Sequence, residues 1–159
     1  MEIQLNQKDA DAVRSMYLQL LENWNNQNAD GFSSLFAENG NAIGFDGSQM
    51  NGRKQINDEI SKIFANHKVS SFVGIIKEVR PLCPTVFILR AFAGMVPPGQ
   101  TNINPAVNAI QTLIAQKEQE QFSIALFHNT PAAFHGRPEL SQQLTEELQQ
   151  VLNNQQNIR

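Results

Sequence analysis

Apolar residues in the first third of the chain recur every three to four positions, a spacing typical of helices that bury one face. The stripe between residues 8 and 26 consists of Ala10, Val13, Met16, Tyr17, Leu20, Leu21 and Trp24. It predicts a long first helix, and Asn6 is suited to be its N-cap. Shorter stripes predict a second helix over residues 29–36 and a third over residues 52–66.

A short hairpin is predicted between the second and third helices. Its arms are residues 42–45 and 49–50. The pair Asp46-Gly47 lies between them and suits a two-residue turn of type I′, because both positions of that turn require a positive φ.

From residue 68 onward, β-branched and aromatic residues dominate, which favours strands. The expected strands are residues 68–80, 85–95, 106–116 and 121–129. Pro81 and Pro84 predict a break between the first two, because proline cannot donate to a ladder. The third run also resembles a helix, and its interpretation as a strand rests on the sheet that it would complete. A final helix is expected from Pro138, and its tail from about residue 153 is expected to fray.

Helices followed by antiparallel strands indicate a single α+β domain over residues 1–159. A curved antiparallel sheet wrapped around the long first helix would form a cone whose open end is a pocket. Several strand segments, such as Val86–Leu89 and Phe122–Phe127, carry apolar residues on both faces. Because the helices can cover only one face of the sheet, we expect a homodimer through the other.

Composition excludes several classes of partner. The net charge is −3 and no basic cluster is longer than Arg53-Lys54, which argues against nucleic acid binding. No apolar run approaches the ~20 residues that a membrane-spanning helix requires. The first residues lack the pattern of a secretory signal, and the lone Cys83 cannot form an internal disulfide. We therefore expect a cytoplasmic protein in which Cys83 acts as a small buried apolar residue.

No motif for a metal or cofactor is present. The histidines at positions 67, 128 and 135 are not spaced as zinc ligands, and no glycine-rich loop leads from a strand into a helix. We expect neither a metal nor a cofactor. His128 ends the apolar run Phe122–Phe127, where an imidazole could act as a general base or hydrogen-bond donor. The simpler interpretation is a strand-end histidine bonded to backbone or water, and Asn129 is expected to hold the loop at Pro131.

The expected pocket lies between the first helix and the last strands. Arg90 is in mid-strand and needs a partner, which could be Glu78, a helix carboxylate, a dimer contact or an anion in the pocket. Tyr17 is expected in the core, with its hydroxyl reaching the cavity as the alternative. The predicted lining is Tyr17, Phe45, Met50, Arg90, Phe92, Asn108, Thr112 and His128, of which His128 is the candidate catalytic residue.

Local strings add a family resemblance that covers the chain to about Leu152. They are Trp24-Asn25, Ala29-Asp30-Gly31-Phe32, Leu35-Phe36-Ala37-Glu38, Gly52-Arg53, Leu89-Arg90-Ala91, Gly94-Met95, Asn104-Pro105 and Asn129-Thr130-Pro131-Ala132. Together with the order of elements, they resemble the nuclear-transport-factor-2-like superfamily, which includes SnoaL-like polyketide cyclases and ketosteroid isomerases. The strings are most similar to its SgcJ/EcaC-like branch. The resemblance implies a cone-shaped, cystatin-like fold with an internal cavity, usually in a homodimer.

The resemblance does not carry over the chemistry of the isomerases. Their carboxylate base falls at Gly44, with Asp46 in the turn beyond, and their tyrosine falls near Leu20, one turn after Tyr17. Two functions stay open. The first is a protein with an apolar pocket that either binds a small apolar molecule or acts as a cofactor-free enzyme of the isomerase, cyclase or hydrolase kind. The alternative is a non-catalytic homodimeric association module whose cavity is incidental.

Overall fold

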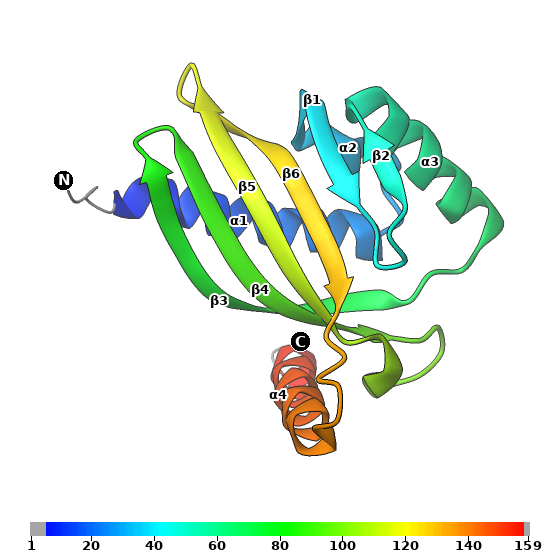
Figure 1. Cartoon of the computed structure of the whole chain (residues 1–159). Coiled ribbons are helices and arrows are strands. Elements are labelled where there is room, and N and C mark those ends of the chain that lie inside the picture. Colours follow the sequence, from blue (N-terminus) through cyan, green and yellow to red (C-terminus); the bar gives the residue numbers. More distant parts are fainter. Residues whose placement is uncertain (1–5, 158–159) are drawn as a thin grey trace.

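The computed structural model describes residues 6–157 and has the α+β organisation that the sequence predicts (Figure 1). Helix α1 comes first, helices α2 and α3 flank a short hairpin, and four long strands precede α4. The elements are α1 (Gln7–Asn25), α2 (Ala29–Ser34), β1 (Phe36–Ile43), β2 (Gln49–Asn51), α3 (Arg53–Asn66), β3 (Ser71–Cys83), β4 (Val86–Val96), the 3-10 helix η1 (Pro105–Val107), β5 (Ala109–Glu118), β6 (Gln121–Pro131) and α4 (Pro138–Asn157). Within this part of the chain, no helix is long and apolar enough to cross a membrane.

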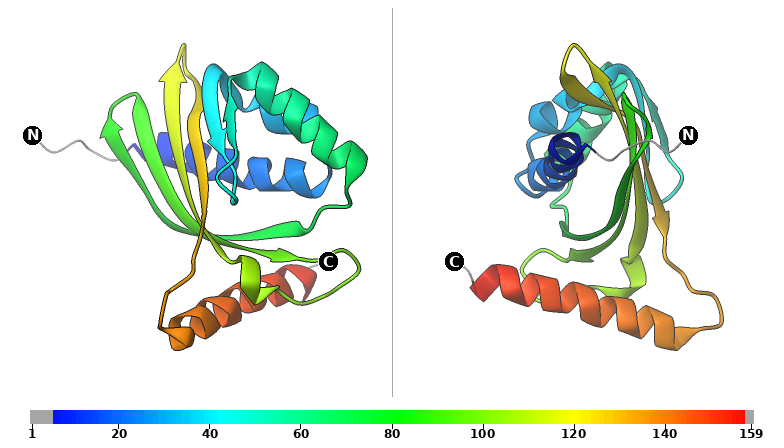
Figure 2. Two further views of the ribbon diagram at one scale, coloured as in Figure 1. Left: turned by 45° about the vertical axis from the view of Figure 1, so that its right-hand side comes forward. Right: turned by 90° about the vertical axis from the view of Figure 1, so that its left-hand side faces the viewer.

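The six strands form one curved sheet in the order β2-β1-β6-β5-β4-β3. All neighbours are antiparallel except β1 and β6, which pair in parallel. Helix α1 lies across one face of this sheet, and α2 and α3 stand beside its β1–β2 edge (Figures 1 and 2). We call the face toward α1 the inner face and the opposite one the outer face. The sheet therefore wraps around α1 as a cone without closing.

Helix α1 forms because its apolar stripe faces the sheet and its first turn is capped. The Asn6 side chain accepts a hydrogen bond from the backbone N–H of Asp9 at 3.2 Å. The Asp9 carboxylate contacts Lys117 Nζ of the β5–β6 hairpin at 3.2 Å. This ion pair is largely buried, and it fixes the start of α1 against the far end of the sheet. All seven predicted stripe residues except Trp24 are buried, and Trp24 packs against the same core.

The β1–β2 region differs from the prediction. Helix α2 ends at Ser34, and Phe36 begins an eight-residue strand instead of closing the helix. Strand β1 stays ordered because it pairs with β6, although its sequence Glu38–Asn41 has little strand preference. The turn is also not of type I′: residues 44–48 form a five-residue loop in which only Gly47 has a positive φ, at 91°.

In the long strands, the structure corrects one prediction and confirms another. Strand β3 continues through Pro81 to Cys83, so the predicted break is confined to the turn at Pro84 and Thr85. Strand β3 is an edge strand, and a proline there need not interrupt the ladder. The strand interpretation of the third run is confirmed from Ala109, after the short η1. The β5–β6 turn is Gln119-Glu120, and both residues have a positive φ without being glycine.

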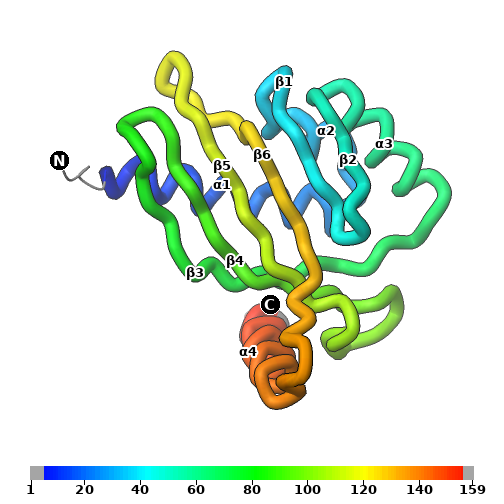
Figure 3. Tube along the Cα trace, viewed as in Figure 1, coloured from blue at the N-terminus to red at the C-terminus, as the bar shows by residue number. Residues whose placement is uncertain are grey.

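Helix α4 packs on the outer side of the curled ends of β3 and β4 (Figures 2 and 3). Its Leu144, Leu148 and Leu152 join Val73 and Val96 in a second, smaller apolar cluster. The helix extends to residue 157, beyond residue 153, where fraying is predicted to begin. Burial of Leu152 holds its last turns, and hydrogen bonds between side chains four residues apart support them.

Candidate functional site

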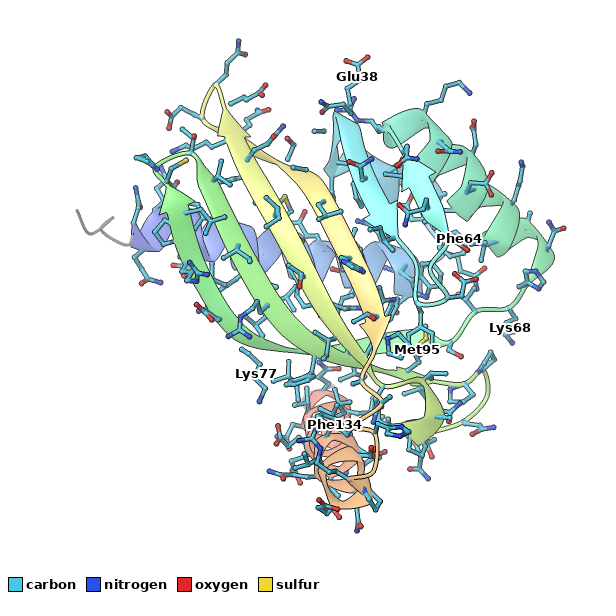
Figure 4. All side chains as sticks on the ribbon, viewed as in Figure 1. Glu38, Phe64, Lys68, Lys77, Met95 and Phe134 are labelled. Atoms are coloured by element: carbon cyan, nitrogen blue, oxygen red, sulfur yellow. The ribbon has the colours of Figure 1, made fainter. Side chains whose placement is uncertain are left out.

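An apolar pocket of about 370 Å³ opens between α3, the β1–β2 hairpin and the ends of β4 and β6. Figure 4 shows Met95, one of its lining residues, at this end of the sheet. The lining residues are Leu21, Trp24, Phe32, Ala42, Ile43, Gly44, Phe45, Asp46, Ser48, Gln49, Met50, Glu59, Ile60, Ile63, Phe72, Met95, Phe127 and Asn129. The pocket therefore draws on segments from most of the chain, which the curvature of the sheet brings together.

An aromatic cluster forms its inner wall. The Trp24 ring lies 6.1 Å from Phe32, 5.5 Å from Phe72 and 5.2 Å from Phe64, centroid to centroid. Trp24 Nε1 also donates to the backbone oxygen of Ser70 at 2.9 Å, which fixes the orientation of the indole. Because Trp24 is the only tryptophan in the chain, tryptophan fluorescence reports on this wall of the pocket.

A buried chain of three polar side chains leads from the core to this pocket. The Tyr17 hydroxyl donates to Gln111 Oε1 at 2.6 Å, and Gln111 Nε2 donates to Asn129 Oδ1 at 3.4 Å. Tyr17 and Gln111 are both 0% exposed, whereas Asn129 is partly exposed and lines the pocket. Burial raises the pKa of Tyr17 well above its ordinary value, so the phenol keeps its proton and donates.

The close fit of α1 to the sheet depends on Gly74 of β3. A Cβ atom at this position would lie 2.6 Å from the Tyr17 hydroxyl and 2.8 Å from a methyl group of Leu21. A residue with a side chain would therefore displace Tyr17 from Gln111. Gly74 therefore supports the hydrogen bond between Tyr17 and Gln111 by leaving room for the Tyr17 side chain.

Two carboxylates, Asp46 and Glu59, stand at the rim. Asp46 Oδ1 accepts from the backbone N–H of Ser48 at 2.9 Å, and hydrogen bonding from Ser48 holds the pKa of Asp46 below its usual range. Glu59 lies 3.6 Å from Lys62 Nζ across the outside of α3. Among the lining residues there is no lysine, arginine or histidine, so the described pocket carries only negative charge.

The structure places only Phe45 and Met50 of the predicted lining at this pocket. Tyr17 is in the core, and its hydroxyl reaches Gln111 instead of the cavity. Asn129, which was predicted only to hold the Pro131 loop, lies in the pocket wall.

Three predicted residues lie on the opposite face of the sheet. Arg90, Thr112 and His128 are cross-strand neighbours on the outer face, next to inward-facing Leu89 and Leu113. Arg90 pairs with Glu78, Nε to Oε2 at 3.0 Å, which is one of the partners anticipated for it. His128 is exposed, so the pocket prediction for it is wrong. A strand's two faces alternate, and an error of one residue in phase transfers every side chain to the other face.

The remaining two predicted residues lie beneath α4. Phe92 packs against Phe134, with ring centroids 6.5 Å apart, and Figure 4 shows Phe134 beside that helix. Asn108 Nδ2 donates to Thr145 Oγ1 of α4 at 2.8 Å. Both residues therefore attach α4 to the sheet instead of lining the pocket. Within residues 6–157, no group of three or more histidine, cysteine, aspartate or glutamate side chains is placed to hold a metal ion.

Gln111 and Asn129 were missed because each has a polar side chain on a face that is otherwise apolar. A signal was nevertheless present in the alternation of β5, where Ala109, Gln111 and Leu113 occupy one face. Gln111 faces Asn129 across the β5–β6 ladder. Two amides on an inner face require each other or a ligand as partners.

Of the comparisons with known proteins, only the one with solved structures finds matches. The sequence matches no family model, and the search of curated proteins finds no match. A domain of unknown function with a cystatin-like fold from Nostoc punctiforme is 22% identical and has a TM-score of 0.77, with 97% of this chain and 98% of that chain covered. An NTF-2 like protein of unknown function from Shewanella oneidensis is 16% identical, with a TM-score of 0.64 over 77% of this chain and 98% of its own.

A ketosteroid isomerase-like protein from Erwinia carotovora atroseptica is 12% identical, with a TM-score of 0.67 over 80% of this chain and 98% of its own. These identities establish the fold and not the activity. The cone predicted from the sequence is confirmed: the chain has the cystatin-like fold, in the arrangement shared by NTF-2 like and ketosteroid isomerase-like proteins.

Proposed function

We propose that this protein binds a small, mainly apolar molecule in the pocket between α3, the β1–β2 hairpin and β6. The observation that carries the proposal is the pocket itself: about 370 Å³, lined mostly by apolar and aromatic side chains, with Asn129 in its wall. Apolar cavities of this size with a few placed polar groups are typical of small-molecule sites. We also propose, from the local strings, that the chain belongs to the SgcJ/EcaC-like branch.

The site favours binding over proton-transfer catalysis. A general base works best when its pKa lies near the working pH. Asp46 is the rim carboxylate on the β1–β2 loop, and hydrogen bonding from Ser48 lowers its pKa. Asp46 is therefore a weak base, and His128 is on the other face of the sheet. Neither Asp46 nor His128 is therefore suited to act as the base of an isomerase or cyclase reaction in this pocket.

The test is titration with tetralin, a bicyclic hydrocarbon with no polar atom, followed by Trp24 fluorescence. We expect a saturable change in emission, because Trp24 lines the pocket, together with a rise in the thermal midpoint. A linear response without saturation, accompanied by an unchanged thermal midpoint, would refute the proposal.

Filling the pocket should remove this binding. In Met50→Trp, a larger side chain replaces a half-buried residue of the rim, and we expect affinity for tetralin to fall at least tenfold with the fold intact. The matched control is Leu18→Trp, which places the same side chain at a 52% exposed position on α1. Calorimetry measures both variants, and equal affinities would show that tetralin binds elsewhere.

We further propose a homodimer through the outer face of the sheet. Ile88, Ile114 and Leu126 are neighbours in register across β4, β5 and β6, and none of them belongs to either apolar cluster of the core. Ile110 of the same strand β5 is 38% exposed. Such an apolar row on a sheet face that α4 leaves open favours a second copy as its cover.

Light scattering should therefore give about twice the chain mass of 17.8 kDa. Ile114→Glu should give monomers, because it places a carboxylate in the middle of the apolar row that the second copy would cover. Leu18→Glu, on the exposed face of α1, should stay dimeric. A wild-type monomer at micromolar concentration would rule the dimer out. A dimer whose pocket binds no tetralin would support the association role instead.

A further inference from the structure

We infer that the pocket selects a neutral molecule with a hydrogen-bond acceptor, such as a ketone oxygen, and that Asn129 Nδ2 donates to it. This inference rests on the proposed function, since it specifies the ligand of the same site. It is carried by the direction of the hydrogen bonds from Tyr17 through Gln111 to Asn129.

The direction is set at the buried end. Tyr17 is 0% exposed, and its hydroxyl proton has Gln111 Oε1 as its acceptor. Gln111 must then present its amide nitrogen to the other side, where Nε2 donates to Asn129 Oδ1. If Gln111 were flipped, the buried Tyr17 proton would lose the acceptor that the structure gives it, at a cost that a buried donor rarely bears.

The pocket end of this series of hydrogen bonds is therefore a hydrogen-bond donor. Asn129 Oδ1 already accepts from Gln111, so the unpaired group that Asn129 offers to the pocket is Nδ2 with its two N–H bonds. Within the described residues, the only fully enclosed side-chain polar atom without a partner is Asn108 Oδ1. Asn129 Nδ2, which has no hydrogen-bond partner among the described side chains and backbone atoms, is thus open to the cavity instead of sealed in the core.

The charge of the pocket rim narrows the class of ligand further. An amide N–H alone could donate a hydrogen bond to a ketone or to a carboxylate. However, the rim carries Asp46 and Glu59, and the lining residues include no cation; Lys62, which is 3.6 Å from Glu59, lies outside the lining. An anionic ligand would lose its hydration without gaining an opposite charge, and the two rim carboxylates would repel it. A neutral acceptor avoids both penalties.

Three compounds of one shape separate the possibilities: 1-tetralone, tetralin and tetralin-1-carboxylate. Dissociation constants come from titrations followed by ¹H–¹⁵N correlation spectra, in which the side-chain amide signal of Asn129 is identified by its loss in Asn129→Leu. We expect 1-tetralone to bind about tenfold tighter than tetralin, which corresponds to one added hydrogen bond. We expect tetralin-1-carboxylate to bind more weakly than tetralin. The Asn129 side-chain signal should move with 1-tetralone and stay nearly unchanged with tetralin.

The variants complete the design. In Asn129→Leu, the preference for 1-tetralone over tetralin should fall to about onefold while tetralin still binds. Asn39→Leu makes the same change at an exposed position of β1 outside the pocket and should keep the preference.

Equal affinities for 1-tetralone and tetralin in the wild-type protein would overturn this inference and leave the proposed binding function standing. A stationary Asn129 signal with bound 1-tetralone would do the same. If neither neutral compound perturbs the pocket signals, the proposed function and this inference both fail.

Discussion

Replacing Tyr17 by phenylalanine is expected to lower the free energy of unfolding by about 1–3 kcal/mol. The substitution removes one oxygen atom and leaves the ring in place. It leaves Gln111 Oε1 without its donor at a position that is 0% exposed. Urea denaturation measures the loss. Ser34→Ala deletes a solvent-exposed hydroxyl that bonds within its own helix, and it should change stability by less than about 0.5 kcal/mol.

A double-mutant cycle tests whether the cost is due to the unpaired amide. Gln111→Leu alone should also destabilise the protein, because it leaves the Tyr17 hydroxyl buried without an acceptor. The double variant Tyr17→Phe, Gln111→Leu removes both partners, and we expect its loss to be smaller than the sum of the single losses. Additive losses would mean that the Tyr17–Gln111 bond contributes little and that the single effects arise from packing.

The free energy of unfolding should also fall steeply above about pH 10. Tyr17 alone should lower it by about 1.4 kcal/mol for each pH unit between its pKa in the unfolded chain and its pKa in the folded protein. In the unfolded chain, tyrosine ionises near pH 10, whereas burial raises the pKa of Tyr17 in the folded protein. Between these two pKa values, unfolding releases a proton. The stabilising contribution is therefore complete below pH 10 and is lost as the pH rises through this window.

The single tyrosine of the chain makes this prediction directly measurable. Tyrosinate absorbance should rise together with the loss of circular dichroism, and not before it. Because other groups also lose protons at alkaline pH, the Tyr17→Phe variant is the reference that isolates the contribution of Tyr17. Its stability should decline less steeply with pH. Tyrosinate absorbance in a protein that is still folded would contradict the assignment of Tyr17 as a sealed donor.

Much of the fold was predictable because local patterns decide it. The stripes of α1 and α3 are periodic enough to identify each helix and its buried face. Strand β1 was not predictable from such a pattern, since residues 38–41 are mostly polar or glycine. It becomes a strand because β6 supplies a parallel partner from the far end of the chain. Tertiary pairing here overrides local preference.

The site was less predictable than the fold for a related reason. Phe45 and Met50 lie next to an obvious turn, so their position near the open end follows from the hairpin alone. Assigning Arg90 or His128 to a face requires the phase of a strand, and the apolar residues on both sides of these strands conceal it. Asn129 gains its role from Gln111, its partner across the ladder, and this register cannot be read from either strand alone.

The parallel pairing of β1 with β6 also bears on the order of folding. Phe36 is paired with Ile124, a separation of 124 − 36 = 88 residues. The pocket wall is likewise shared between residues 21–63 and residues 72–129. A contact of such long sequence separation forms late, because closing a long loop costs entropy before the contact repays it. During synthesis, β1 therefore emerges well before β6 and lacks this parallel partner until β6 follows. The binding pocket is among the last features to form, and chaperone demand should be greatest just before residue 124 leaves the ribosome.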